Sequence, residues 1–175
     1  MTTDQLRTST FTIPGLSRLQ RNHGLEHATL HVLSETHPRL AFAGHSDTGG
    51  FWIIGNLDTD DLRAAVDTAL NRLRAGESNL AIHPNCGTNL VATGALAGLA
   101  AWFGMLGADR APRDRLERLP IVIGLSTVAL LAGQPLGMFL QARVTTSGHP
   151  GDLEVVDIQS SHRRGVQAHR VLTRG

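Results

Sequence analysis

Two histidines and a glutamate stand at the spacing of a metal-binding helix, in the segment His23-Gly24-Leu25-Glu26-His27. The surrounding stretch, Leu16 to Thr36, has the pattern of an amphipathic helix. Residues three and four apart share a helix face, so His23 and His27 can reach one ion with Glu26 beside them. This H-x-x-E-H order is the inverse of the H-E-x-x-H zinc motif. It favours a zinc ion held by two imidazoles, with Glu26 as a general base for metal-activated water.

A second motif, His83-Pro-Asn-Cys-Gly-Thr-Asn89, stands directly before a long apolar run. The spacing of His83 and Cys86 allows one turn to offer two metal ligands. Cys86 would start a helix, where the dipole and the amide groups favour a thiolate, which is both a zinc ligand and a nucleophile. The alternatives are that Cys86 is a small buried apolar residue and that His83 is a turn histidine bonded to backbone.

Four other residues extend the candidate site. His31 and Glu35 continue the stripe of His23 and are possible outer-shell partners of a ligand. Asp47 and Glu154 are possible third or fourth ligands. A solvated or structural role is the alternative for each of the four.

Two runs without a charged residue, Thr88–Ala108 and Leu119–Ala142, dominate the second half of the chain. Each is long enough to cross a bilayer, which takes ~20 apolar residues. The polar stretch Asp109–Arg118 between them predicts a helical hairpin with its turn in water. The alternative, two buried helices of a soluble bundle, is disfavoured because so small a protein could hardly cover them.

The hairpin carries small residues spaced four apart, a pattern typical of close helix packing. They are Gly94 and Gly98 in the first run, then Gly133 and Gly137 in the second. We expect the lipid bilayer as a partner, and self-association or another membrane protein as further partners that these faces allow.

Composition narrows the remaining classes. A formal net charge of +1 does not suggest nucleic-acid binding, and a single cysteine excludes an internal disulfide. The first twenty residues hold no apolar run, so no signal peptide is expected. The positive-inside rule would place the four arginines of the linker in the cytoplasm, whereas the long head without a signal favours a cytoplasmic head at a bacterial inner membrane. We expect the cytoplasmic head.

The expected fold class is α+β, a small head joined to a two-helix transmembrane hairpin. Helices are predicted over 16–36 and 60–74, and short strands over 40–44, 51–56, 80–83 and 153–158. The expected organisation is a flexible N-terminus (1–13), the head (14–87), the hairpin (88–142, with helices 88–108 and 119–142), and a C-terminal strand with a peripheral basic tail (143–175).

A resemblance to known proteins covers Arg21 to Ile158. It is carried by the two histidine motifs, by Gln141-Ala-Arg-Val-Thr-Thr146, and by Gly151-Asp-Leu-Glu-Val155, in one order. The chain resembles the YqhQ-like bacterial membrane proteins, and more closely a smaller related family of unknown function. The resemblance implies a metal-dependent enzyme without an established reaction. Its implied functional residues are His23, Glu26, His27, His83 and Cys86.

These observations lead to a membrane-anchored zinc-dependent hydrolase, with peptidase as one candidate activity. His23, His27 and Cys86 would hold zinc, His83 would be an alternative or fourth ligand, and Glu26 would be the base. The second hypothesis is a non-catalytic membrane interaction module in which a structural zinc joins head and hairpin. Three protein ligands would favour the enzyme, and four would favour the structural site. A third hypothesis makes Cys86 a nucleophile with a histidine as its base.

Overall fold

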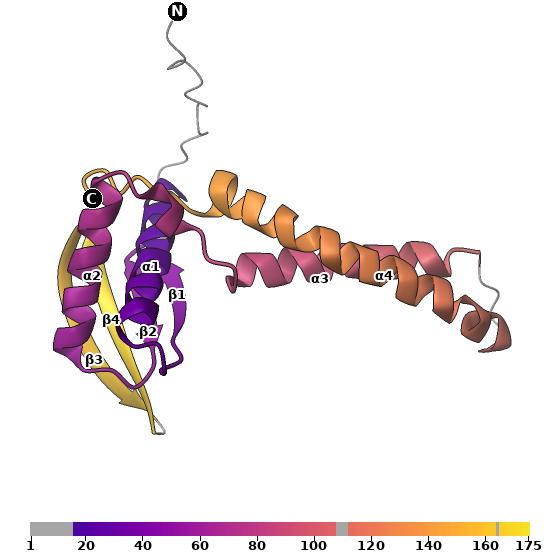
Figure 1. Cartoon of the computed structure of the whole chain (residues 1–175), viewed down its shortest axis with the longest axis horizontal. Helices are drawn as coiled ribbons and strands as arrows, with labels where there is room; N and C mark the ends of the chain where they lie inside the picture. The colour runs from indigo at the N-terminus through magenta and orange to yellow at the C-terminus, as the bar shows by residue number, and fades with distance from the viewer. Residues whose placement is uncertain (1–15, 108–111, 164) are drawn as a thin grey trace, which may run out of the picture. The chain divides into compact units, whose positions relative to one another are not determined.

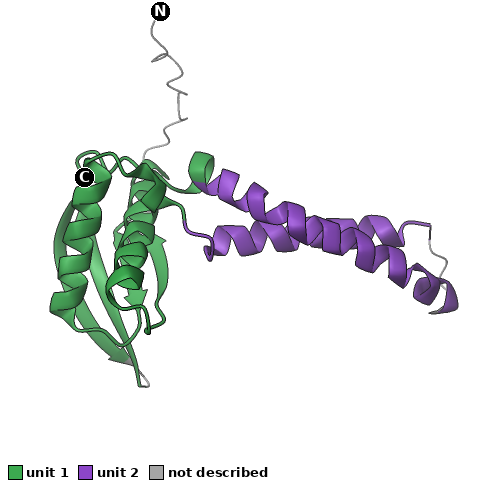
Figure 2. Cartoon of the chain, viewed as in Figure 1, with its two compact units in different colours: residues 1–82, 142–175 green, residues 83–141 purple. Residues whose placement is uncertain are grey.

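The structure, a computed structural model, describes residues 16–107, 112–163 and 165–175. The predicted flexible segment 1–13 therefore lies outside the described residues. The chain divides into two units, which Figure 2 distinguishes by colour. Unit 1 consists of residues 1–82 and 142–175, and unit 2 consists of residues 83–141. The head is thus built from both ends of the chain, with the hairpin inserted between them in sequence.

Two helices cover one face of the sheet in unit 1 (Figure 1). Helix α1 spans Leu16–Thr36 and helix α2 spans Thr59–Arg74, close to the predicted ranges. Helix α1 stops before His37-Pro38 because proline disfavours the helical conformation in the residue that precedes it. The side chains that α2 buries follow the helical period: Leu62, Ala65, Val66, Ala69, Leu70 and Leu73.

The sheet of unit 1 has four antiparallel strands in the order β1-β2-β4-β3. Their ranges are Ala43–Asp47 (β1), Gly50–Ile54 (β2), Glu154–Arg163 (β3) and Val166–Arg174 (β4). Phe51 of β2 and Ile158 of β3 both pair with Val171 of β4, and these side chains join the core beneath the helices.

Two predictions for the head were wrong. The C-terminal residues are not a peripheral tail but an interior strand, because His169, Val171 and Thr173 alternate inward and are buried. Residues 80–83 are not a strand. A short 3-10 helix, η1 (Ser78–Ala81), stands there instead, and the Ala81 and Ile82 carbonyl groups accept hydrogen bonds from α1 side chains rather than from another strand.

Unit 2 is a helical hairpin of α3 (Gly87–Met105) and α4 (Pro112–Leu140), and a π-helical turn, η2 (Gln141–Thr145), follows α4. Both helices are long and apolar enough to cross a membrane. Only 11% of each apolar window is buried, whereas the core helices of soluble proteins are mostly buried. Most apolar side chains in these two stretches of the hairpin are therefore not covered by the described protein, which is weak evidence for membrane insertion.

The polar linker is shorter than predicted, because α4 begins at Pro112 rather than at residue 119. Proline suits the first helical turn, where its missing N–H group has no helical partner to lose. Arg113 pairs with Glu117 one turn later, at 3.1 Å, on an exposed helix face. The charged residues before position 119 therefore did not mark a loop, because most of them belong to the first turns of α4.

Two of the three glycines of α4, Gly133 and Gly137, pack closely against α3, as predicted. A Cβ atom on Gly133 would come within 2.7 Å of the Thr93 Cα atom, and one on Gly137 within 2.7 Å of the Asn89 Cα atom. On α3, Gly104 makes a similar approach, since a Cβ atom there would come within 3.2 Å of the Val122 Cα atom of α4, whereas the predicted pair Gly94 and Gly98 does not take part in the packing. A Cβ atom on Gly94 or Gly98 would meet nothing within 4 Å among the described residues.

Candidate metal centre

His23 and His27 lie side by side on α1, with ring centroids 4.4 Å apart. The four-residue spacing of the H-x-x-E-H segment therefore brings the two rings together, as helix geometry predicts. His27 is 2% exposed, and His23 is half-buried. Two imidazoles on one partly enclosed helix face are the core of many metal sites.

Backbone carbonyl groups fix the tautomer of both histidines. His27 Nδ1 donates to the Ala81 carbonyl oxygen at 2.8 Å, and His23 Nδ1 donates to the Thr145 carbonyl oxygen at 2.9 Å. A carbonyl oxygen can only accept, so each neutral ring carries its proton on Nδ1 and its lone pair on Nε2. This is the arrangement in which a second-shell carbonyl orients a metal-binding imidazole.

Gly24 explains how Thr145 comes so near to α1. A Cβ atom at this position would collide with the carbonyl oxygen of Ser147, so only glycine lets the segment after η2 approach the helix. The contact is reinforced by Gln20, whose carbonyl accepts from the Ser147 N–H at 2.9 Å and whose amide donates to the Val144 carbonyl at 2.6 Å. The glycine inside the H-x-x-E-H segment therefore has a packing role.

Glu26 is 4% exposed, and its carboxylate accepts a hydrogen bond from the Ser46 hydroxyl group of β1. Gly44 makes room for the carboxylate, since a Cβ atom there would overlap it. Burial raises the pKa of the Glu26 carboxyl above its ordinary value, against the opposing effects of Ser46, His23 and His45. A raised carboxyl pKa is typical of a general base that must exchange protons near neutral pH.

Within unit 2, Cys86 is the N-terminal cap of α3, and its Sγ atom accepts a hydrogen bond from the Thr88 N–H at 3.4 Å. The Cys86 side chain is buried. A cysteine that receives backbone N–H groups at a helix start is stabilised as a thiolate. The role of Cys86 as a ligand or a nucleophile stays a prediction, and its burial also fits the alternative of a small buried residue.

His83 has a different environment within the same turn. Its Nδ1 atom accepts from the Asn85 N–H at 3.2 Å, which places the proton of a neutral ring on Nε2. The backbone N–H group of His83 donates to the side-chain oxygen of Gln141 at 3.0 Å. Asn89 completes the network, since it accepts from Gln141 at 2.7 Å and donates to the Pro84 carbonyl at 2.6 Å. Amide side chains thus brace the turn that holds His83 and Cys86.

His23, His27 and Cys86 form a group that could hold a metal ion. The other candidates have structural partners. Glu35 pairs with Arg72, Asp47 with Arg170, and Glu154 with Arg174, at 2.9, 2.7 and 2.7 Å respectively. His31 donates from Nε2 to the Ile82 carbonyl at 2.9 Å. None of these four belongs to a metal-binding group among the described residues.

Sequence reasoning missed the groups that support the site. The carbonyl groups of Ala81 and Thr145 carry no side-chain signal, so no residue pattern could reveal them. Asn89 and Gln141 did offer a signal, because each is an amide at the edge of an apolar run. A buried amide side chain needs hydrogen-bond partners, and here Gln141 donates a hydrogen bond to Asn89.

Comparison with known proteins shows a match to the DUF6391 domain, a domain of unknown function, over residues 18–158. The chain is also 39% identical over 168 residues to an uncharacterised protein of Picosynechococcus sp. (strain ATCC 27264 / PCC 7002 / PR-6), covering 85% of this chain and 77% of that protein. No solved structure matches the chain.

Proposed function

The chain belongs to the DUF6391 family, and we propose that it is a membrane-anchored hydrolase that uses a metal ion held by His23, His27 and Cys86. Zinc is the metal we expect, because two imidazoles and one thiolate are ligands that zinc prefers. The main observation behind this proposal is the pair of hydrogen bonds from His23 and His27 to backbone carbonyl groups. They place the proton of each ring on Nδ1 and the lone pair that can bind a metal on Nε2.

The length of chain between the two motifs supports Cys86 as the third ligand. Ala81 and Ile82 are tied to α1 within unit 1 by the hydrogen bonds from His27 and His31. Cys86 follows Ile82 by only four residues, which span at most about 14 Å when extended. This short connection limits how far Cys86 can lie from Ile82, and we propose that a metal ion would bring its thiol to the two histidines.

Three protein ligands would leave one position of a tetrahedral site for substrate or water. The hydrogen bond from the Asn85 N–H group to His83 supports three ligands rather than four. It occupies Nδ1 of His83, which is the nitrogen that carries the lone pair when the proton is on Nε2. When bound, the metal would supply Lewis-acid polarisation and would acidify water. Glu26, adjacent to His27 and raised in pKa by burial, would accept the proton.

The hairpin defines where the reaction would take place. Helices α3 and α4 would anchor the protein in the bacterial inner membrane, with the head in the cytoplasm. The resemblance to the YqhQ-like proteins supports a metal-dependent enzyme of the membrane surface and implies no particular reaction. Peptide bonds of membrane-associated chains are the first substrates to test, because metal-held water with a glutamate base is suited to amide hydrolysis.

Metal content tests the site. Detergent-purified wild type should carry about one zinc per chain, which His27→Ala and Cys86→Ser should each lose. Glu26→Gln and His83→Ala should retain the metal. His37→Ala, a half-buried histidine directly after α1 that lies 3.6 Å from Asp61, is the matched control. Retention of zinc by both His27→Ala and Cys86→Ser would refute the proposed ligand set.

Two further outcomes separate the rival functions. Loss of zinc from His83→Ala would indicate four protein ligands and a structural site that joins head and hairpin. Rapid alkylation of Cys86 in zinc-loaded and zinc-free protein alike would favour the nucleophile hypothesis, because a coordinated thiolate is protected.

Activity tests the hydrolase itself. Wild type in lipid nanodiscs should cleave members of a quenched fluorescent peptide library, and zinc removal should abolish cleavage. Glu26→Gln should lose activity by a factor of roughly 100 or more while it keeps its zinc, because a general base contributes about that much. A Glu26→Gln variant with full zinc and full activity would contradict the assigned role.

A further inference from the structure

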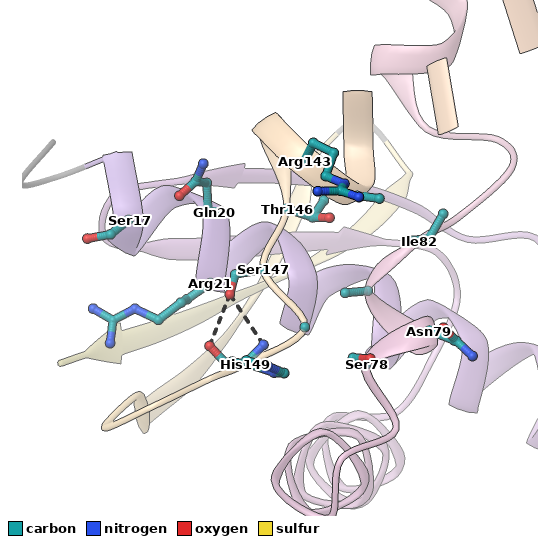
Figure 3. A pocket seen from close by; sticks show the side chains of 13 residues that line it. Ser17, Gln20, Arg21, Ser78, Asn79, Ile82, Arg143, Thr146, Ser147 and His149 are labelled. Atoms are coloured by element: carbon teal, nitrogen blue, oxygen red, sulfur yellow. Dashed lines mark hydrogen bonds between the residues drawn. The ribbon is translucent and has the colours of Figure 1, made fainter. Parts of the chain in front are cut away.

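Unit 1 contains a cavity of about 480 Å³ that the proposed metal centre does not use. Three segments line it: the start of α1, the short helix η1 with Ile82, and residues 142–149 (Figure 3). The cavity is partly open to solvent, so a ligand can enter it.

The charged residues that line the cavity are basic. Arg21 and Arg143 line the cavity, and none of the described residues that line it is acidic. Figure 3 shows Arg143 beside Thr146, while Arg21 lies on the side of the hydrogen-bonded pair Ser147 and His149. Two guanidinium groups around one cavity attract an anion, and phosphate oxygens match their fork of donors.

Arg21 has donor capacity that the protein does not use. One of its terminal nitrogens pairs with the exposed carboxylate of Asp152, yet its buried Nε atom has no hydrogen-bond partner within the described part of the chain. Buried donors of this kind are rare in native proteins and each requires an explanation, such as an absent ion or water. A bound anion beside Arg21 would supply one.

Neutral groups complete the lining. The Asn79 amide and the Ser17 hydroxyl group lie at the cavity, and both can donate to an oxygen anion. Arg143 stands three residues after Leu140, where α4 ends. If α4 crosses the bilayer, this arginine is at headgroup depth, where basic pockets bind lipid phosphates.

We propose that this cavity is a binding site for a phosphate-bearing anion, with Arg21 and Arg143 as its charged contacts. The phosphate belongs either to a lipid headgroup or to a small soluble ester, and the same two arginines would contact both. The carbonyl group of Ala81, a lining residue, accepts the hydrogen bond from His27 Nδ1, and that of Thr145, which precedes the lining residue Thr146, accepts the one from His23 Nδ1. The anion is bound through guanidinium groups and does not require the metal.

Two binding arms distinguish the sources. In the first, inorganic phosphate is titrated against detergent-purified protein by calorimetry at constant ionic strength. In the second, nanodiscs containing phosphatidylglycerol are compared with phosphatidylcholine nanodiscs, and retained lipid is measured by native mass spectrometry. Phosphate binding indicates a soluble ester as ligand, and selective retention of phosphatidylglycerol alone indicates a headgroup.

The variants are chosen to isolate charge from folding. Arg143→Gln and Arg21→Gln should each weaken binding by roughly 10-fold or more, as expected for a lost charge-assisted hydrogen bond. Asp152→Asn removes the same ion pair as Arg21→Gln but leaves the guanidinium group, so it should bind at least as well as wild type. Arg63→Gln, on the exposed face of α2, is the control for net charge.

The experiment separates this site from the proposed metal centre. Phosphate can also bind zinc, so both arms are repeated with His27→Ala, which should still bind the anion while it lacks the metal. The proposal is overturned if neither arm shows binding, if Arg143→Gln and Arg21→Gln bind like wild type, or if binding disappears in His27→Ala. That last result would assign the anion to the metal and leave the metal proposal intact.

Discussion

Replacing Gly24 with alanine should damage both the stability of the head and its affinity for metal. The added methyl group would point at the carbonyl oxygen of Ser147, which is backbone and cannot rotate away. Either α1 or the segment after η2 must therefore move. The first hydrogen bonds to suffer join Ser147 to Gln20 and His23 to Thr145.

Opposing effects set the size of the change. Alanine is favoured over glycine inside a helix by about 1 kcal/mol. Overpacking against a rigid group costs up to about 3 kcal/mol, and each lost hydrogen bond adds about 1 kcal/mol. The clash should win, with a net loss of about 2 kcal/mol or more in the free energy of unfolding. Zinc affinity should fall about 10- to 100-fold, since His23 loses the carbonyl that orients it.

Urea denaturation of detergent-purified protein measures the first quantity. The fluorescence of Trp52, which lies in β2, reports on the head when Trp102 of α3 is replaced by phenylalanine. Gly94→Ala is the matched control, because its methyl group enters open space on a helix and should leave stability unchanged or slightly higher. A Gly24→Ala protein with wild-type stability and wild-type zinc affinity would refute the close approach of Ser147.

Three further outcomes are expected. Gly137→Ala should destabilise the hairpin by about 1–3 kcal/mol, whereas Gly98→Ala should not, because only the methyl group at position 137 would meet the facing helix at contact distance; equal melting of the two variants in detergent would contradict the packing. Thr173→Val should cost about 1–3 kcal/mol in denaturant unfolding, since it leaves the buried oxygen of Asn22 without the donor now 2.7 Å away; a neutral result would exclude that bond as a stabilising contact. Burial lowers the pKa of His169, so the unfolded chain binds a proton at this residue more readily than the folded chain does. The contribution of His169 to stability is therefore complete above pH about 6.5 and is lost as the pH falls below that value. His169→Gln should flatten this pH dependence of the free energy of unfolding, and an unchanged pH profile would rule out the role of His169.

The sequence predicted the helices well because their patterns are long. Helix α2 repeats its apolar positions over four turns, and α1 ends at a proline dipeptide, so few alternatives compete. Residues 80–83 show the limit of short patterns. Leu-Ala-Ile reads as a strand, but the local chain forms η1 and gives its carbonyl groups to histidines that are fifty residues away.

The C-terminal strand was hidden by its own polar residues. His169 and Thr173 face inward with Val171, so hydrophobicity does not alternate along β4 although burial does. Gly165, with φ at +79°, lies in the turn before this strand and was a usable turn signal. For the site, residue types and spacing predicted which side chains could meet, but they could not reveal which ring nitrogen is protonated.

The strand order also dictates when the head can form during synthesis. Strand β4 lies between β2 and β3, yet it is translated after both hairpin helices. Until residues 166–174 emerge, β2 lacks its neighbouring strand β4. Asn22 of α1 also lacks the hydrogen bond that the Thr173 hydroxyl group donates to it. If α3 and α4 insert into a membrane, they would therefore do so before the sheet of the head is complete. Closure of the head becomes a late event, and a chain that fails to insert would leave its edge strand open to aggregation and quality control.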